Sequence, residues 1–357
     1  MVTGPQAPDT DKGNDMINLF TGMQPLEVGE TSPAALIDRV RELDESAVID
    51  RVLVGYSSIW PHNHATAPFL LALSDKLSPI VAHRPGVMSP VAAARYFATL
   101  DLLAEGRLAI NLVVGGSDKD LHREGDYTPK AERYRRAIEY LDVMKRTWAD
   151  PEAFDHHGDY YDADAVKILA RPGAGHVPIF MGGESDDAVD FGARHADLYM
   201  LWGEPLAGTK ERVDRVREVA WDRYDRDIEF SLSLRLFVGD TDDEAWALAR
   251  DAERQIMAAQ GTHRFLRSSA TDRSVGRERA LALVDEEVHD DCFWTGLTKL
   301  LGGFANSQAL VGSEDRVLDT LGRYRDLGIG TFLVTTGAEA GWDPSLEPFL
   351  ARVKEEL

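Results

Sequence analysis

The chain has 357 residues, of which 61 are acidic and 39 basic, so its formal net charge is −22. A surface this acidic repels nucleic acid and anionic lipid, and no apolar stretch approaches the length of a membrane span. The single cysteine, Cys292, excludes a disulfide framework and a cysteine-based metal site, and it fits a reducing, cytoplasmic setting. Residues 1–15 are polar and lack a signal-peptide core, so we expect a disordered tail there.

Short apolar runs alternate with helical patterns along the rest of the chain. The predicted strands cover 17–21, 47–55, 79–82, 107–114, 178–181, 197–202, 228–238 and 331–335. Predicted helices cover 34–43, 67–77, 89–103, 129–148, 210–225, 293–304, 313–327 and 344–357, with others starting near 187 and 242, and a hairpin is expected at 153–168. Eight strands alternating with helices predict an α/β fold, and eight repeats favour a closed (β/α)8 TIM barrel over an open doubly wound sheet.

We expect one domain over residues 16–357, because no linker or composition shift divides it. Residues 261–290 are polar, Arg-rich and without a clean period, and they interrupt the connection to the last strand. Loops of this length in a compact domain are usually functional or disordered. This stretch is therefore predicted to be a mobile, lid-like insertion.

The stretch 177–205 reads as strand, glycine turn, helix and strand. Gly182 and Gly183 follow the first strand, and Glu184-Ser185-Asp186-Asp187 opens the helix. Glycines let backbone N–H groups approach a ligand, and a helix start attracts anions, which together predict a phosphate site. Acidic residues also favour helix starts for stability alone. The local sequence leaves both interpretations open.

In a TIM barrel the carboxyl ends of the strands carry the chemistry. Three histidines fall at predicted loop ends, His62, His64 and His83, where they could transfer protons or be solvated loop residues. The strand at 228–238 alternates, so Ser231, Ser233 and Arg235 share one face, which we expect to point into the barrel.

Several motifs together carry a family resemblance. They are HRPGVMSPVAAARYFATLDLLAEGRLAINLVVGGSD (83–118), AERYRRAIEYLDVMKRTW (131–148), GGESDDA (182–188), DDEAW (242–246), TDRSVGRERALAL (271–283) and ALVGSEDRV (309–317). Taken in this order, they cover nearly everything after the tail. The chain resembles the bacterial-luciferase-like flavin-dependent monooxygenases, and within them most the alkanesulfonate monooxygenases.

The resemblance implies a (β/α)8 barrel that binds reduced FMN (FMNH2) and activates O2 as a C4a-peroxyflavin to oxygenate a small organic substrate. A sulfonate or another organosulfur compound is one substrate class that it suggests. It also implies a separate NAD(P)H flavin reductase and a cytoplasmic homo-oligomer, a dimer or tetramer. Two alternatives remain: a flavin-binding protein without turnover, and an F420-dependent oxidoreductase on the same fold.

The resemblance also assigns flavin contacts to individual residues. It places Asn111 near the flavin ring, Trp202 at the end of the sixth strand, and Tyr134, Gly183 and Ser185 at the phosphate. Asn111, Tyr134 and Trp202 could equally be packing residues. Glu184 departs from the small residues usual there, so it must turn outward or weaken phosphate binding.

The substrate half departs further from the alkanesulfonate pattern. Ser233 and Arg235 stand where those enzymes carry Arg-x-His, while Leu301, Gly337 and Trp60 fall near their expected Arg, Tyr and Cys. Arg235, His83, His62 and His64 are therefore the candidate catalytic residues, with Arg235 holding an anion or pairing with a carboxylate such as Glu204. His156-His157 lacks the spacing of a metal site, and no metal is expected.

Overall fold

The computed structural model describes residues 16–23, 32–115, 117–258, 274–303 and 307–357. The predicted tail at 1–15 lies outside the described residues, as does the first part of the predicted insertion, up to residue 273.

Eight parallel strands close into a barrel. In barrel order they are β1 (Asn18–Met23), β2 (Arg51–Val54), β3 (Pro79–His83), β4 (Ala109–Leu112), β7 (Ile179–Met181), β8 (Leu198–Trp202), β9 (Glu229–Gly239) and β13 (Ile329–Thr335). Pairing of β13 with both β9 and β1, and of β8 with β9, completes the ring. The predicted (β/α)8 barrel is therefore confirmed, and the open sheet is excluded.

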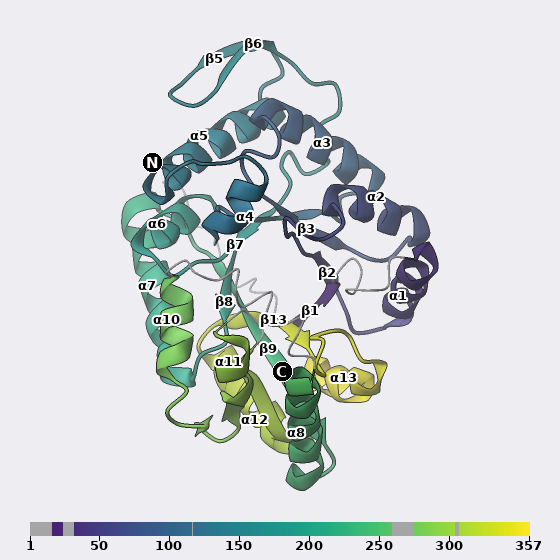
Figure 1. The fold of residues 1–357 in the computed structure, drawn as a ribbon. Helices are drawn as coiled ribbons and strands as arrows, with labels where there is room; N and C mark the ends of the chain where they lie inside the picture. Colours follow the sequence, from purple (N-terminus) through teal and green to yellow (C-terminus); the bar gives the residue numbers. More distant parts are fainter. Residues whose placement is uncertain (1–15, 24–31, 116, 259–273, 304–306) are drawn as a thin grey trace, which may run out of the picture.

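Helices surround the strands (Figure 1). They are α1 (Pro33–Glu45), α2 (Asn63–Leu73), α3 (Pro90–Leu103), α5 (Lys130–Ala149), α6 (Asp186–His195), α7 (Leu206–Tyr224), α8 (Asp242–Ala258), α12 (Glu314–Asp326) and α13 (Glu347–Glu356), the last preceded by the 3-10 turn η1 (Pro344–Leu346). The Ser-Pro pairs at 32–33 and 89–90 start α1 and α3, where each serine side chain accepts a hydrogen bond from a backbone N–H of the first turn. Short elements at the periphery are α4 (Asp118–Arg123) and the antiparallel hairpin of β5 (Phe154–His157) and β6 (Asp162–Val166).

Side-chain alternation along the strands separates the barrel interior from the helix layer. The interior is filled by Phe20, Ile80, Ala109, Phe180, Leu198 and Leu333, with Leu53 and Met200 packed against them. The intervening residues, such as Val81, Ile110 and Leu232, pack under the helices in the main core. Side chains on the same strand face as these interior residues, but nearer the carboxyl ends of the strands, therefore line the mouth of the barrel.

Strand β9 is longer than the barrel needs. Beyond Arg235 it pairs in parallel with β12 (Ala309–Ser313), which pairs antiparallel with β11 (Phe293–Trp294) and then β10 (Val288–His289). The sequence prediction of a helix over 293–304 is wrong at its start, because Phe293 and Trp294 form a strand with β12, and α11 spans only Gly296–Leu301. The remaining helix, α10 (Val275–Ala282), lies in the described part of the predicted insertion.

Candidate active site

The glycine turn after β7 meets helix α5 at the start of α6. A Cβ on Gly182 would lie 2.1 Å from the carbonyl oxygen of Met200, so only glycine lets β7 end against β8 here. A Cβ on Gly183 would lie 2.5 Å from the Cβ of Ala188 and 3.7 Å from the hydroxyl of Tyr134. The turn therefore packs closely against the start of α6, with the Tyr134 hydroxyl beside it, and a residue larger than glycine would clash there.

Ser185 lies at the end of this turn, where α6 begins. It caps α6 by accepting a hydrogen bond of 3.2 Å from the N–H of Ala188. Burial raises the pKa of Tyr134, and a side-chain hydrogen bond with Ser185 opposes that rise. The structure thus brings together Gly183, Ser185 and Tyr134, the three residues that the resemblance assigned to the phosphate. Two hydroxyl groups and a helix start beside a glycine turn are a suitable set for a phosphate.

Glu184 does not turn outward. Its side chain is 11% exposed and forms an ion pair with Arg212 of α7, whose side chain is 7% exposed. Arg212 also donates 3.0 Å to the carbonyl oxygen of Gly183, which accepts a second bond of 2.8 Å from Tyr199. The sequence reasoning missed Arg212, although its place beside Val213 on the apolar face of α7 was a signal of burial.

Helix α10 lies over this turn. Arg279 of α10 holds both carboxylate oxygens of Glu204 at 2.7 and 2.8 Å, which raises its pKa, and it also reaches Glu211 at 3.4 Å and Glu184 at 3.9 Å. A Cβ on Gly276 would lie 2.7 Å from Glu184 and 3.2 Å from the Trp202 ring. We call Glu184, Glu204, Glu211, Arg212 and Arg279 the phosphate-turn cluster.

Asn111 and Trp202 both face the barrel interior. On β4 the residues Ala109 and Asn111 share one face, and Ala109 belongs to the interior set. On β8 the same holds for Leu198 and Trp202. Both side chains are half-buried. The structure therefore places them at the mouth, where the resemblance expects flavin contacts.

Arg235 points inward as predicted. The alternate residues Leu234 and Leu236 belong to the core under the helices. The guanidinium is 3% exposed, and its Nη1 donates to the carbonyl oxygens of Gly337 at 2.6 Å and Ala338 at 3.0 Å. Burial lowers its pKa to about 10, and the nearby Glu339 acts in the opposite direction. Arg235 therefore anchors the loop after β13.

Glu204 is one carboxylate that the sequence offered as a partner for Arg235. Glu204 is engaged by Arg279 of α10 instead. Gly337 adopts a φ of +64°, so the loop turns sharply there and directs its carbonyl oxygen toward Arg235.

Two of the three candidate histidines lie outside the barrel. His83 falls on the face of β3 opposite to Ile80, is fully buried, and contacts Nε2 of His64 at 3.0 Å and the hydroxyl of Tyr140 at 2.6 Å. Burial, and secondarily His62, lowers the pKa of His64 to about 4, and burial holds the pKa of His83 well below its usual value. The exposed ring of His62 lies 5.0 Å from that of His64, at the start of α2.

This placement corrects the view of His83 and His64 as residues of the barrel mouth. Strand β3 ends at His83, but its side chain packs between the strand and the helices, against Phe97 and Tyr140. His64 packs against Tyr96 in the same layer. Of the three histidines, only His62 keeps an accessible ring.

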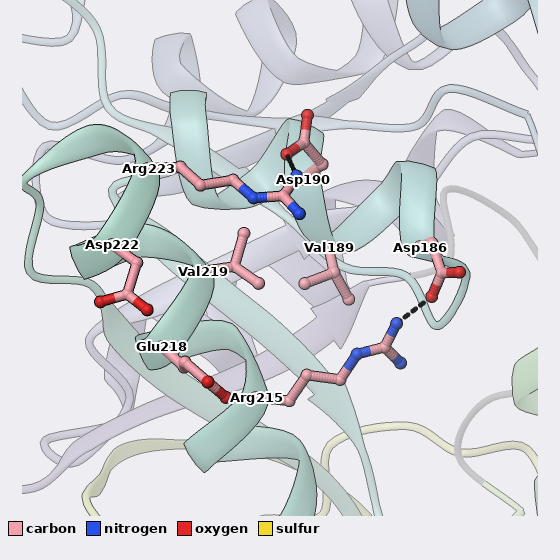
Figure 2. Close-up of a pocket in the computed structure, with 8 residues that line it drawn as sticks. All are labelled: Asp186, Val189, Asp190, Arg215, Glu218, Val219, Asp222 and Arg223. Atoms are coloured by element: carbon pink, nitrogen blue, oxygen red, sulfur yellow. Dashed lines mark hydrogen bonds and ion pairs between the residues drawn. The ribbon is translucent and has the colours of Figure 1, made fainter.

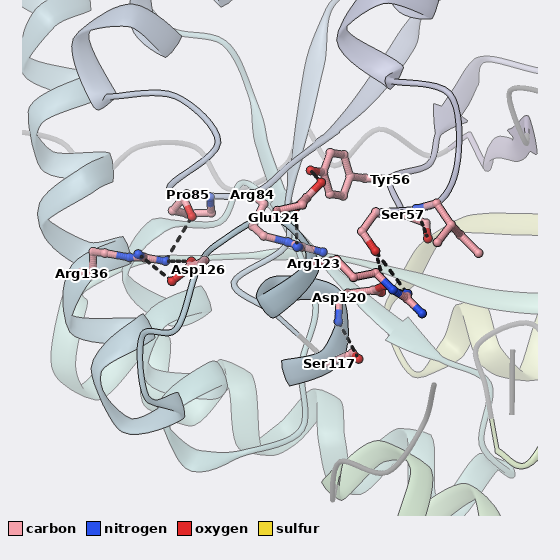
Figure 3. A network of polar contacts seen from close by, with 12 residues as sticks. Tyr56, Ser57, Arg84, Pro85, Ser117, Asp120, Arg123, Glu124, Asp126 and Arg136 are labelled. Atoms are coloured by element: carbon pink, nitrogen blue, oxygen red, sulfur yellow. Dashed lines mark hydrogen bonds and ion pairs between the residues drawn. The ribbon is translucent and has the colours of Figure 1, made fainter. Parts of the chain in front are cut away.

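A polar network on the side of β2 and β3 was not predicted (Figure 3). Arg84 is 5% exposed, binds Glu124 at 2.9 Å, and lies 4.8 Å from the centre of the Tyr56 ring. Tyr56 donates to the other carboxylate oxygen of Glu124. Further along, Asp120 of α4 accepts a 2.5 Å bond from Ser58. The short helix α4, which the sequence pattern did not indicate, brings these acids to the mouth.

The outer face of α6 and α7 carries a groove of about 430 Å³ (Figure 2). Its floor is Val189 and Val219, and ion pairs of Arg215 with Asp186 and of Arg223 with Asp190 cross it. Its lining comes from α6 and α7 and includes none of Asn111, Trp202 and Arg235, so it is not the candidate active site.

Within the described ranges, no group of three or more His, Cys, Asp or Glu side chains could hold a metal ion. No helix in the same part of the chain is long and apolar enough to cross a membrane.

The sequence profile of the luciferase-like monooxygenases matches residues 16–331. The chain belongs to the luciferase-like monooxygenase family. This membership makes the protein an oxidoreductase of the monooxygenase class. The matched residues include the turn at Gly183 and the barrel mouth.

Solved structures of several enzymes share the fold of this luciferase-like monooxygenase. DmoA from Hyphomicrobium sulfonivorans is 18% identical with a TM-score of 0.74, over 94% of this chain and 86% of that one. The oxygenating constituent of 3,6-diketocamphane monooxygenase from Pseudomonas putida, in complex with FMN, is 19% identical with a TM-score of 0.69, over 96% and 98%. An F420-dependent secondary alcohol dehydrogenase is 15% identical with a TM-score of 0.68, over 96% and 98%. At these identities the likeness concerns the fold alone.

Proposed function

We propose that this luciferase-like monooxygenase uses reduced FMN, delivered by a separate NAD(P)H flavin reductase, to activate O2 and oxygenate a small organic substrate. The observation that carries the proposal is the convergence of Gly183, Ser185 and Tyr134 at one glycine turn at the end of β7. The FMN-containing diketocamphane enzyme supports this choice of cofactor. We also propose a cytoplasmic location and a homo-oligomeric state, a dimer or tetramer.

The residues divide into a phosphate side and a ring side. Tyr134 and Ser185 would hold the phosphate, with the start of α6 directed at it. Asn111 and Trp202, which face the barrel interior, would contact the flavin ring. When bound, reduced FMN supplies the electrons that activate oxygen. The chain's own contribution is to orient the ring and to exclude water beneath α10.

On the substrate side, Arg235 positions the loop after β13 through two carbonyl oxygens. Ser233 and Arg235 stand at the two positions of the Arg-x-His pair, and β9 has no histidine, so that pair does not exist on β9. His62 is the histidine that remains exposed for proton transfer near the mouth. A sulfonate or another organosulfur compound is therefore one class to test among several.

The test is product analysis of turnover with reduced FMN against panels of sulfonates, thioethers, amines and ketones. We expect oxygen uptake coupled to an oxygenated product, with little free peroxide. Oxygen uptake that yields only peroxide with every substrate would favour a flavin-binding protein without turnover.

The F420-dependent dehydrogenase neighbour defines the competing cofactor. F420 carries an anionic tail, which the net charge of −22 disfavours. Extraction of the cofactor from the purified protein, followed by absorbance, separates the two: a flavin spectrum supports FMN, and a deazaflavin spectrum excludes it.

A further inference from the structure

The phosphate-turn cluster contains a buried cation that is already engaged. Arg212 lies at the glycine turn, where it donates to the carbonyl oxygen of Gly183, and its guanidinium pairs with Glu184. Ser185, the residue that caps α6, directly follows Glu184 in the chain. A phosphate bound at Ser185 would therefore arrive beside a guanidinium whose charge is neutralised by a carboxylate of the same turn.

Electrostatics makes these two anions competitors. FMN carries a phosphate with a charge between −1.5 and −2 near neutral pH, while a carboxylate carries −1. Both side chains of the ion pair are almost excluded from water, so the interaction of an anion with Arg212 is poorly screened. Burial lowers the pKa of Arg212 to about 9, as expected for a guanidinium whose charge is costly to bury.

Glu184 has a second cation within reach. Arg279 of α10 lies 3.9 Å from its carboxylate, while binding Glu204 and Glu211 more closely. A carboxylate displaced from Arg212 would therefore move toward α10, and each additional anion on Arg279 would hold that helix more firmly over the turn.

We propose that Glu184 and the flavin phosphate compete for Arg212, so that phosphate binding transfers Glu184 to Arg279 and fastens α10 over the site. The inference rests on the proposed function, since it takes the flavin phosphate to bind at Ser185. It assigns Glu184 as a specificity-determining residue that weakens the preference for FMN over riboflavin. It also couples cofactor binding to the docking of α10.

The charge balance of the cluster implies a weak preference for FMN over riboflavin in the natural protein. Within its described residues, two guanidinium groups face three carboxylates, those of Glu184, Glu204 and Glu211. A phosphate adds further negative charge to a cluster that is already negative. Removing one carboxylate should therefore improve the binding of the phosphate-bearing flavin, and of that flavin alone.

The experiment titrates the full-length protein with oxidised FMN and, separately, with riboflavin, followed by quenching of flavin fluorescence. Glu184→Gln keeps the shape of the side chain and frees Arg212. We expect it to tighten FMN binding about tenfold, the strength of one hydrogen bond to a charged group, and to leave riboflavin binding unchanged. Glu218→Gln is the matched control, because it removes one exposed negative charge from α7, the helix of Arg212, outside the cluster.

A double variant, Glu184→Gln with Arg212→Met, removes both charges and avoids an unpaired buried cation. We expect it to lose the gain in FMN affinity, so that FMN binds no more tightly than to the natural protein, while riboflavin binding stays unchanged. An FMN affinity that stays high in the double variant would show that Arg212 does not hold the phosphate.

Hydrogen exchange of a peptide covering residues 275–282 tests the coupling to α10. FMN should slow exchange in this peptide more than riboflavin does, and Glu184→Gln should abolish the difference. A difference in exchange that persists in Glu184→Gln would overturn the role of Glu184, as would equal gains in affinity for FMN and riboflavin in this variant or weaker FMN binding. A natural protein that binds neither flavin would overturn the proposed function itself.

Discussion

Acid destabilisation of the buried His64–His83 pair can be worked out from the structure. His64 is 8% exposed, and its pKa is lowered to about 4, chiefly by burial. The value in an unfolded chain is about 6.5. Between these two values the unfolded state binds a proton that the folded state excludes, so stability falls as the pH falls through this window.

The size of the effect follows from the same numbers. Moving from about pH 7.5 to about pH 5 protonates His64 almost fully in the unfolded chain and scarcely in the folded one. This difference lowers the free energy of unfolding by about 2 kcal/mol through His64. His83 is held neutral in the same way and adds to the loss.

Urea unfolding at the two pH values, on the natural protein and on His64→Gln, measures this contribution. Glutamine stays neutral and can still contact His83. The natural protein should lose about 2 kcal/mol more than the variant between the two pH values. Identical losses in both proteins would refute the idea that His64 is buried in its neutral form.

Three further predictions concern the site. Tyr134→Phe combined with Ser185→Ala should weaken FMN binding about tenfold or more, measured by flavin fluorescence, and an unchanged affinity would remove the phosphate assignment. Arg235→Met should retain FMN binding and folding but lose substrate oxidation. Its free energy of unfolding should fall by about 1–3 kcal/mol, because two carbonyl oxygens lose their donor. Normal turnover would exclude a functional role for Arg235, and an unfolded variant would leave only a structural role. Protease cleavage should concentrate within 261–290 in the ligand-free protein and decrease when flavin and substrate are added, whereas full protection without ligand would contradict a lid.

The barrel could be predicted because its signal is repeated. Each strand is a short apolar run followed by a helical period, and the inward face of β9 was readable from its alternation of serine and leucine. Capping chemistry is local too, because Ser32 and Ser89 each accept a hydrogen bond from a backbone N–H in the first turn of the helix that follows. Features that depend only on residues close together in the chain could therefore be predicted from the sequence.

The remainder depended on contacts between distant parts of the chain. His83 stands at the end of a strand, but one position along the strand decides whether a side chain faces the barrel or the helices, and no local pattern fixed that position in β3. Arg212 and Arg279 come from two helices that meet only in the folded protein. Strand β12 could not be recognised, since its partner is the far end of β9.

Strand β9 extends past the barrel, so the strand pairs that close the barrel do not depend on the segment that follows β9. Strand β13 returns to pair directly with the first part of β9, while β12 uses only the part beyond Arg235. Insertions or deletions between residues 240 and 308 therefore change the rim of the mouth without breaking a hydrogen bond between the barrel strands. For protein engineering, this segment is the natural place to exchange sequence when a new substrate is wanted on an unchanged scaffold.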